Sequence, residues 1–453
     1  MVKYFSENLS DKNSIIKQKI LELCMNSGDF SIADFARELN CSVPTTTKIV
    51  GELIDDGWLE DLGKKGSASG RRPSIFGLNP EAGFFVGVDL ERNHANIMTM
   101  DFKGQTLSYD EDVEFTLMNT EDSCRKLCGL IRKILEDNGL GSERMLACNV
   151  DLTGRVNTAS GYSFTYFINE DKPLSAILEE DLGVPVALDN DSRAMTYGEF
   201  RSGIANGERS VLFINVGWGL GMGMILNGDL YYGKSGFSGE FGHFPFLDNG
   251  QICRCGKIGC LETGASGSAL QRIVTEKLEA GCPSMLADKY KTGKELTLND
   301  LLGAVEEEDV VAIDAMGEIG TTLGRGIAGL INIFNPEIVI LGGKLTVGGD
   351  YLMLPVRAAI KKYSLNIVSK DTTIVFSKLG RKAGSLGCCM LARTRFLGVD
   401  VGFASIKPIP PRHHKVTFPA APRSSVADST PKARKTRRIE RRDISSPLSS
   451  LDT

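Results

Sequence analysis

The chain has 453 residues, 42% of them apolar, and a formal net charge of −5. This length exceeds one ordinary hydrophobic core and predicts roughly three domains. The sequence has neither a run of about 18 apolar residues nor the apolar N-terminal segment of a secretory signal. These properties argue against a membrane protein and predict a cytoplasmic location.

The charge is unevenly distributed along the chain. From residue 405 onward, eleven Lys and Arg stand against four Asp and Glu, a net of +7, so the rest of the chain carries −12. A globally acidic protein binds nucleic acid only through a local basic patch. Segment 404–453 is rich in Pro and Ser, which predicts a basic, disordered tail. The tail either adds non-specific DNA affinity or has no function, and both interpretations stay open.

The first 80 residues predict a helix-turn-helix. Apolar residues recur at helical spacing over 13–26. Ser31 is placed to cap a second helix, and Ser42 to cap a third that begins at Val43-Pro44. A short turn, Asn40-Cys41, joins these two helices. A plain three-helix bundle would give a similar pattern.

The next segment favours the DNA-binding interpretation. Residues 58–79 predict a strand, a glycine-rich basic loop and a second strand, which together resemble a wing. Hydroxyl side chains at the start of the third helix can enter a major groove, and arginines on the loop can reach the backbone or the minor groove. The candidate DNA-binding residues are Thr45, Thr46, Thr47, Lys48, Arg71 and Arg72.

Beyond residue 83, apolar strands alternate with amphipathic helices, which predicts an α/β fold. The expected strands are 84–90, 95–102, 145–152, 184–191, 213–216, 336–343 and 373–377. The expected helices are 123–138, 192–199, 312–333 and 383–396, the last of which would close a second lobe.

Residues 240–262 carry more chemistry than any other window. His243, Cys253, Cys255 and Cys260 supply one imidazole and three thiolates, a ligand set that suits a tetrahedral structural Zn²⁺. Glycines in the loop before the last cysteine allow the sulfurs to converge. The alternative is that the cysteines are small buried residues or a redox pair. The other eight of the 11 cysteines are expected to be buried thiols.

This window resembles the zinc signature of the ROK family (repressors, open reading frames and kinases), a histidine followed by C-x-C-G-x-x-G-C-x-E. The resemblance covers residues 12–398 and includes a Gly-Arg-Arg-Pro run after the wing. It implies a winged helix-turn-helix followed by a two-lobed actin-like ATPase (ribonuclease H-like) domain. The domains expected on this basis are 12–80 for DNA binding, 81–200 for the N-terminal lobe, and 201–398 for the C-terminal lobe.

The same resemblance implies a set of sugar-binding residues: Asn190, Asp191, Glu240, His243 and Glu262. In the kinases of the family the residue matching Asp191 is the general base. A carboxylate at the end of a strand could equally be only a helix N-cap. The resemblance also implies that His243 binds both the metal and the sugar.

Two loops depart from the family's ATP site. After Asp89 the expected glycines are replaced by Leu90-Glu91-Arg92-Asn93, which places a negative charge where a phosphate would lie. Trp218 stands where the kinases have threonine. The Gly342-Gly343 pair resembles the adenosine-side loop, although a plain tight turn explains it as well.

The sequence therefore predicts a sugar-responsive DNA-binding transcriptional regulator with a structural Zn²⁺. Its expected partners are double-stranded operator DNA, a sugar or sugar phosphate, and a second copy of the chain, because repressors bind paired half-sites as homodimers or homotetramers. The alternative is an ATP-dependent sugar kinase that uses Mg²⁺, with Asp191 as base and an accessory DNA-binding domain.

Overall fold

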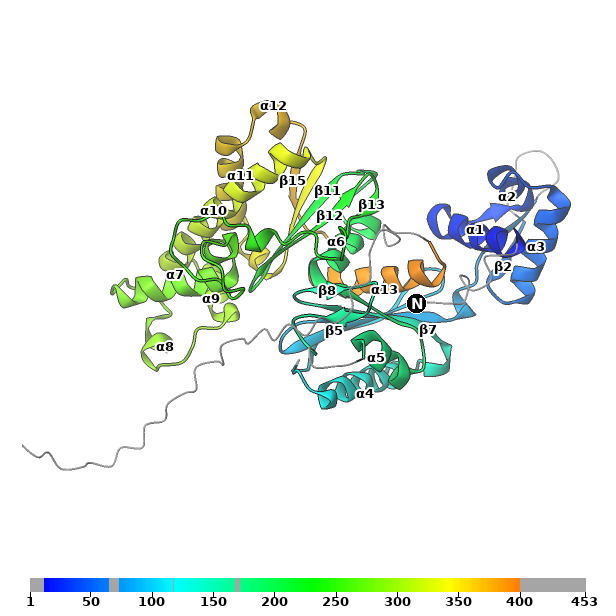
Figure 1. The fold of residues 1–453 in the computed structure, drawn as a ribbon, viewed down its shortest axis with the longest axis horizontal. Coiled ribbons are helices and arrows are strands. Elements are labelled where there is room, and N and C mark those ends of the chain that lie inside the picture. Colours follow the sequence, from blue (N-terminus) through cyan, green and yellow to red (C-terminus); the bar gives the residue numbers. More distant parts are fainter. Residues whose placement is uncertain (1–11, 65–72, 117, 168–171, 400–453) are drawn as a thin grey trace, which may run out of the picture. The chain divides into compact units, whose positions relative to one another are not determined.

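The computed structural model describes residues 12–64, 73–116, 118–167 and 172–399 (Figure 1). Within these ranges, no helix combines the length and the apolar character needed to cross a membrane. The chain forms an N-terminal helix-turn-helix unit followed by two lobes, each built on a five-stranded sheet. The predicted fold class, helix-turn-helix followed by a two-lobed α/β domain of the actin-like type, is confirmed.

The N-terminal unit is ordered by local capping. The predicted cap Ser31 exchanges hydrogen bonds with Asp34, and Ser42 accepts the backbone N–H of Thr45. The turn passes through Asn40 at φ 50°, a left-handed conformation that asparagine tolerates better than most residues. The antiparallel sheet has the order β1-β3-β2. The elements are α1 Lys12–Ser27, β1 Phe30–Ser31, α2 Ile32–Glu38, α3 Val43–Asp55, β2 Leu59–Lys64 and β3 Ser74–Leu78.

The first lobe has the strand order β10-β7-β4-β5-β6. Strand β7 runs parallel to β4 and β10, whereas β5 and β6 are antiparallel additions. Its strands are β4 Phe84–Leu90, β5 His94–Asp101, β6 Thr106–Glu114, β7 Met145–Leu152 and β10 Val186–Asn190, with a small hairpin, β8 Val156–Asn157 and β9 Tyr162–Ser163. Its helices are α4 Glu121–Asp137, α5 Leu174–Leu182 and α6 Asp191–Ser202, with short turns η1 Pro80–Ala82 and η2 Ser142–Arg144.

The second lobe repeats this topology in the order β13-β12-β11-β14-β15, with β11, β14 and β15 parallel. In open sheets of this kind, ligands bind beyond the carboxyl ends of the parallel strands. The strands are β11 Val211–Val216, β12 Leu220–Leu226, β13 Asp229–Leu230, β14 Ile338–Gly342 and β15 Thr373–Phe376. The helices are α7 Gly267–Glu279, α8 Ala287–Lys291, α9 Leu298–Glu306, α10 Val310–Phe334, α11 Asp350–Tyr363 and α12 Asn366–Ser369, with short turns η3 Phe241–His243, η4 Leu261–Gly264, η5 Lys344–Gly348 and η6 Gly380–Lys382.

Helix α10 positions the segment that carries the candidate metal ligands. A Cβ at Gly324 would lie 2.5 Å from the carbonyl oxygen of Val356 in α11. One at Gly326 would lie 2.7 Å from Leu261 and 2.9 Å from Phe241. Both glycines therefore permit close packing, the first against α11 and the second against η3 and η4.

Helix α13 (Ala383–Phe396) has the expected bounds but a different place. It packs mainly against β4 and β7 of the first sheet and along α6, while Cys388 and Leu391 join the core cluster of the second sheet (Figure 1). The approach is close, because a Cβ at Gly387 would lie 1.9 Å from the carbonyl oxygen of Ala194 and one at Gly87 would lie 2.1 Å from that of Ser385. Helical periodicity identifies a buried helix, but it does not identify the sheet against which the helix packs.

Candidate functional site

The four candidate metal ligands converge. The Nδ1 or Nε2 atom of His243 and the sulfurs of Cys253, Cys255 and Cys260 all lie within 4.8 Å of one another. The Sγ atoms of Cys255 and Cys260 are 3.6 Å apart, and Nδ1 of His243 lies 3.6 Å from Sγ of Cys253. Two sulfurs bound to one Zn²⁺ at about 2.3 Å in tetrahedral geometry are about 3.8 Å apart. The residues present therefore fit a tetrahedral metal ion.

Backbone geometry brings these ligands together. Gly256 and Gly259 have φ of 83° and 76°, so the loop between the second and third cysteines turns through left-handed positions. A Cβ at Gly259 would also lie 2.1 Å from the carbonyl oxygen of Leu247. Burial, the largest cause, raises the pKa of the Cys253 and Cys260 thiols above the usual range. A bound cation would offset that cost by stabilising the thiolates.

Glu240 and Glu262 each lie beside one of the candidate metal ligands. Nε2 of His243, the ring nitrogen that faces away from Cys253, lies 3.8 Å from a carboxylate oxygen of Glu240. Oε1 of Glu262 lies 3.7 Å from Sγ of Cys253, and its Oε2 accepts the backbone N–H of Leu220 at 2.9 Å. The second glutamate therefore ties the cluster to the first residue of β12.

Asn190 and Asp191 lie where β10 ends and α6 begins. The N-cap of α6 is Asn190, whose Oδ1 accepts the backbone N–H of Arg193 at 3.3 Å, so the cap role weighed for Asp191 belongs to its neighbour. Asn190 Nδ2 also donates to Asp191 Oδ1 at 2.7 Å. Oδ1 of Asp191 further accepts the backbone N–H of Ser192 at 2.7 Å. Burial raises the pKa of Asp191 to about 6.

Strands β11 and β12 of the second lobe meet the start of α6. Nδ2 of Asn215, on β11, lies 3.3 Å from Oγ of Ser192. A Cβ at Gly221 of β12 would lie 2.2 Å from the same oxygen. Because β12 begins at Leu220, which binds Glu262, one strand contacts both the α6 start and the metal segment.

A charged cluster joins the lobes on the predicted nucleotide side. Nζ of Lys344, just after β14, lies 2.6 Å from a carboxylate oxygen of Glu91, just after β4. Nε2 of His94 lies 3.0 Å from the same oxygen and 2.9 Å from the lysine nitrogen. Burial would raise the pKa of Glu91, but the hydrogen bond from His94 and the charge of Lys344 outweigh it and hold that pKa at about 2. This carboxylate stays ionised and paired with a cation of the other lobe.

From the sequence alone, Glu91 is only a departure from the family's loop, because nothing local identifies a partner about 250 positions away. The sequence also gives no indication of a network around the fully buried Asp189, which accepts hydrogen bonds from Nε of Arg193 at 2.7 Å and from Nη2 of Arg395 at 2.6 Å. The available signal is a carboxylate that directly follows the apolar run Val186–Leu188, since buried charges require partners.

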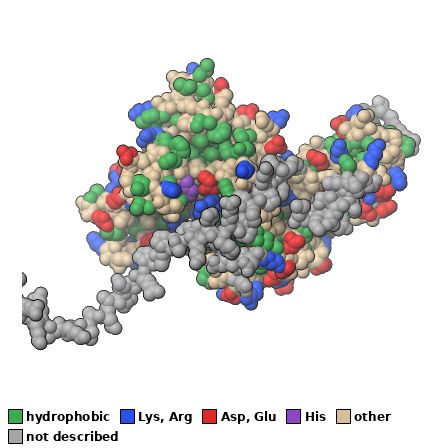
Figure 2. Space-filling view, in the orientation of Figure 1, with side chains coloured by type: hydrophobic (Ala, Val, Ile, Leu, Met, Phe, Trp, Pro, Cys, Tyr) green, Lys and Arg blue, Asp and Glu red, His purple; other side chains and the backbone are tan. Residues whose placement is uncertain are grey.

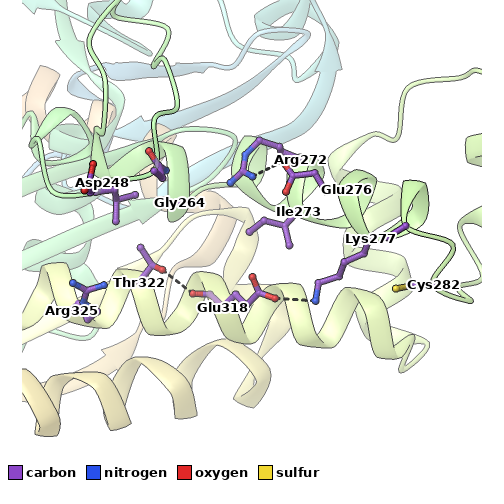
Figure 3. A pocket seen from close by; sticks show the side chains of 13 residues that line it. Asp248, Gly264, Arg272, Ile273, Glu276, Lys277, Cys282, Glu318, Thr322 and Arg325 are labelled. Carbon is purple, nitrogen blue, oxygen red and sulfur yellow. Dashed lines mark hydrogen bonds and ion pairs between the residues drawn. The ribbon is translucent and has the colours of Figure 1, made fainter. Parts of the chain in front are cut away.

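A separate cavity of about 570 Å³ lies between α7 and α10 (Figure 3). Ion pairs join Arg272 to Glu276 at 2.8 Å and Lys277 to Glu318 at 2.9 Å along its wall. None of the candidate sugar or metal residues lines it. Its charges are largely matched within the wall, so it offers no clear site for a charged ligand.

On the N-terminal unit, Thr45, Thr47 and Lys48 are exposed at the start of α3. Thr46 is fully buried and its hydroxyl donates to the carbonyl oxygen of Ser42 at 3.1 Å, so the prediction that it contacts DNA is corrected. Consecutive helical residues lie about 100° apart, and one of three neighbouring threonines must therefore face inward. Arg71 and Arg72, like the tail 404–453, lie outside the described residues.

A model of the "ROK family" matches residues 85–395, most of both lobes. The chain belongs to the ROK family. A xylose repressor of Caldicellulosiruptor bescii is 28% identical over 383 residues, covering 83% of this chain and 94% of the repressor. A solved ROK family transcriptional regulator, a homologue of the Escherichia coli Mlc protein, is 27% identical with a TM-score of 0.72, covering 85% of this chain and 97% of its own.

ROK kinases are similar over a smaller share of the chain. A ROK family glucokinase from Streptomyces griseus, solved with glucose and AMPPNP, is 28% identical with a TM-score of 0.60. The match covers all of the glucokinase but 69% of this chain, whereas the match to the ROK regulator covers 85% of this chain. The similarity to the regulator therefore extends over more of this ROK chain.

Proposed function

We propose that this ROK protein is a sugar-responsive DNA-binding transcriptional regulator, a repressor of genes of carbohydrate metabolism. The observation that carries the proposal is the helix-turn-helix unit joined to two lobes whose nucleotide side holds the Glu91–Lys344 ion pair. Phosphoryl transfer depends on cations and backbone donors around the γ-phosphate. Here a carboxylate and its lysine are paired with each other, which favours a sensor over a kinase.

The sugar would bind between the α6 start and the metal segment. Asn190 and Asp191 offer hydrogen-bonding groups on one side, and Glu240, His243 and Glu262 offer them on the other. Zn²⁺ held by His243, Cys253, Cys255 and Cys260 would have a structural role and fix the loop that carries these groups. The names of the similar proteins make D-xylose and D-glucose the first ligands to test.

The DNA-binding surface would be the start of α3 together with the loop between β2 and β3. Thr45, Thr47 and Lys48 supply exposed donors at the helix end that enters a major groove in such units. Arg71 and Arg72 would add phosphate or minor-groove contacts. We keep the domain limits 12–80, 81–200 and 201–398, with a basic tail at 404–453.

The test is DNA binding by fluorescence anisotropy, using a duplex that the wild-type protein selects from a random library. Lys48→Ala should weaken binding and reduce the slope of log K against log salt by about one unit, because one phosphate contact is lost. Lys133→Ala, which removes an exposed lysine of α4 in the first lobe, is the matched control. An unchanged affinity and slope for Lys48→Ala would remove α3 from the interface.

The second candidate is an ATP-dependent sugar kinase, favoured by the intact Asp191 with its raised pKa of about 6. A coupled assay with ATP, Mg²⁺, D-glucose, D-xylose and N-acetyl-D-glucosamine distinguishes the two. We expect no turnover above background. Robust turnover that is lost in Asp191→Ala would establish the kinase.

A further inference from the structure

We propose that helix α13 couples the sugar side of the cleft to the DNA-binding unit, with Arg395 as the positioning residue. The inference rests on the proposed function and adds the route by which a bound sugar would alter DNA binding. It depends on two neighbouring side chains at the end of one helix, Arg395 and Phe396, which face different parts of the molecule.

Arg395 is bound to the strand that carries the sugar residues. Its Nη2 donates to Oδ2 of Asp189 at 2.6 Å and to the hydroxyl of Tyr232 at 2.9 Å, and its Nη1 donates to Oδ1 of Asn149. Oδ1 of Asp189 accepts the backbone N–H of Asn190 at 2.9 Å. A single carboxylate therefore links α13 to the first residue of the proposed sugar site.

The neighbouring side chain faces the DNA-binding unit. The ring of Phe396 lies 5.9 Å from that of Trp58, which comes just before β2, and 5.6 Å from that of Phe85 in β4. These rings belong to a core cluster shared by α1, α3 and the first sheet. Just beyond the helix, the carbonyl oxygen of Gly398 accepts a hydrogen bond from Gln18 of α1 at 2.7 Å.

Close packing makes helix α13 a rigid connection between these contacts. It meets α6 through Gly198 and Gly387 and meets β4 through Gly87, at distances that leave no room for a Cβ. Close-packed interfaces of this kind have discrete arrangements rather than a continuous range. A shift of Asp189 when sugar binds beside it would be passed to Arg395, because a buried charge keeps its partner. It would then reach Trp58 through Phe396.

The test measures the coupling ratio, the Kd for DNA with saturating sugar divided by the Kd without it. The duplex is the one selected by the wild-type protein, and the sugars are D-xylose, D-glucose and N-acetyl-D-glucosamine, with sugar affinity measured by calorimetry. The variants are Arg395→Lys, which loses the fork between Asp189 and Asn149, and Phe396→Leu, which loses the ring contacts. We expect both coupling ratios to move at least threefold toward one, while the DNA affinity of the sugar-free variants stays within about threefold of wild type.

The matched control is Arg132→Lys. Arg132 of α4 donates to the carbonyl oxygen and the carboxylate of Asp181 in α5, so it serves neither the Asp189 network nor the ring cluster around Phe396. It should retain the wild-type ratio even if its melting temperature falls. Wild-type ratios in both Arg395→Lys and Phe396→Leu would overturn the role of α13. A changed ratio in Arg395→Lys alone would also overturn it, because Phe396→Leu tests the contact with the DNA-binding unit.

A failure of the proposed function is distinguishable from a failure of this inference. It would show in the wild-type protein as no selected duplex, or as no effect of any of the sugars on DNA binding, and the coupling route would then fall with it. If Arg395→Lys does not fold, Phe396→Leu with Trp58→Phe decides the question from the DNA-binding side.

Discussion

At the scale of single residues, burial and hydrogen bonding have opposite effects on the pKa of Asp191. Three groups donate to its Oδ1, yet burial outweighs them and raises its pKa to about 6. An acid whose pKa is higher in the folded chain than in the unfolded chain destabilises the fold once it ionises. Such a cost is typical of a group retained for ligand binding rather than for stability.

This gives a pH prediction for Asp191. If the ionised carboxylate accepts a sugar hydroxyl, sugar affinity should fall by up to tenfold per pH unit below about pH 6. Calorimetry between pH 5 and 8 measures the effect with D-xylose or D-glucose. Asp191→Asn should bind more weakly with a flat profile, whereas Asp229→Asn, at an exposed carboxylate on β13, should keep the wild-type profile.

The stability of the same variant provides an independent check. The contribution of Asp191 is favourable below the unfolded pKa near 4 and is lost as the pH rises through about 6. Asp191→Asn should therefore melt a few degrees higher than wild type at pH 7 but not at pH 4. A lower melting temperature at pH 7 would show that the carboxylate contributes net stability, contrary to the burial argument.

At the scale of elements, local signals predicted structure well and long-range contacts poorly. Strand β4 and helix α13 have the expected bounds, because periodicity and flanking glycines are local properties. The place of α13, the inward turn of Thr46 and the pairing of Glu91 with Lys344 all depend on tertiary packing. The sequence places the four metal-binding residue types in one window. Only the structure shows that their ligand atoms lie within 4.8 Å of one another.

The segment from η3 to η4 gives a prediction about metal removal. Cys255→Ser should lower the zinc content from about one per chain to near zero, because a tetrahedral structural site requires all four ligands. The melting temperature should also fall, since metal binding energy is folding energy. Elemental analysis and thermal unfolding measure both, with Cys282→Ser, a partly buried cysteine outside the cluster, as the control.

A site without zinc would give a different result. Two results would favour the alternative that the cysteines are plain buried thiols. One is a zinc content near zero in the purified wild-type protein, and the other is an unchanged melting temperature in Cys255→Ser. Chelator treatment of the wild-type protein should also lower its affinity for sugar if the metal segment carries His243 and Glu262 toward the sugar.

At the scale of the whole molecule, the second lobe exposes apolar side chains that a monomer would have to leave in water. Figure 2 shows such side chains gathered over this lobe. Exposed large apolar residues on α10 to α12 and the link between them include Ile333, Leu354, Tyr363, Leu365 and Ile367. Exposed apolar side chains that gather in one region are typical of a protein interface. It supports the prediction that the chain associates with itself.

The oligomer prediction follows from symmetry as well as from this surface. A dimer presents two α3 helices to paired half-sites, so loss of the dimer should weaken DNA binding far more than loss of one side-chain contact. Leu365→Lys with Ile367→Lys should convert the protein to a monomer in light scattering and weaken binding to the selected duplex by at least tenfold. Val310→Lys, at another exposed apolar residue of the same lobe, should change neither. A wild-type monomer that binds one half-site with full affinity would contradict this prediction.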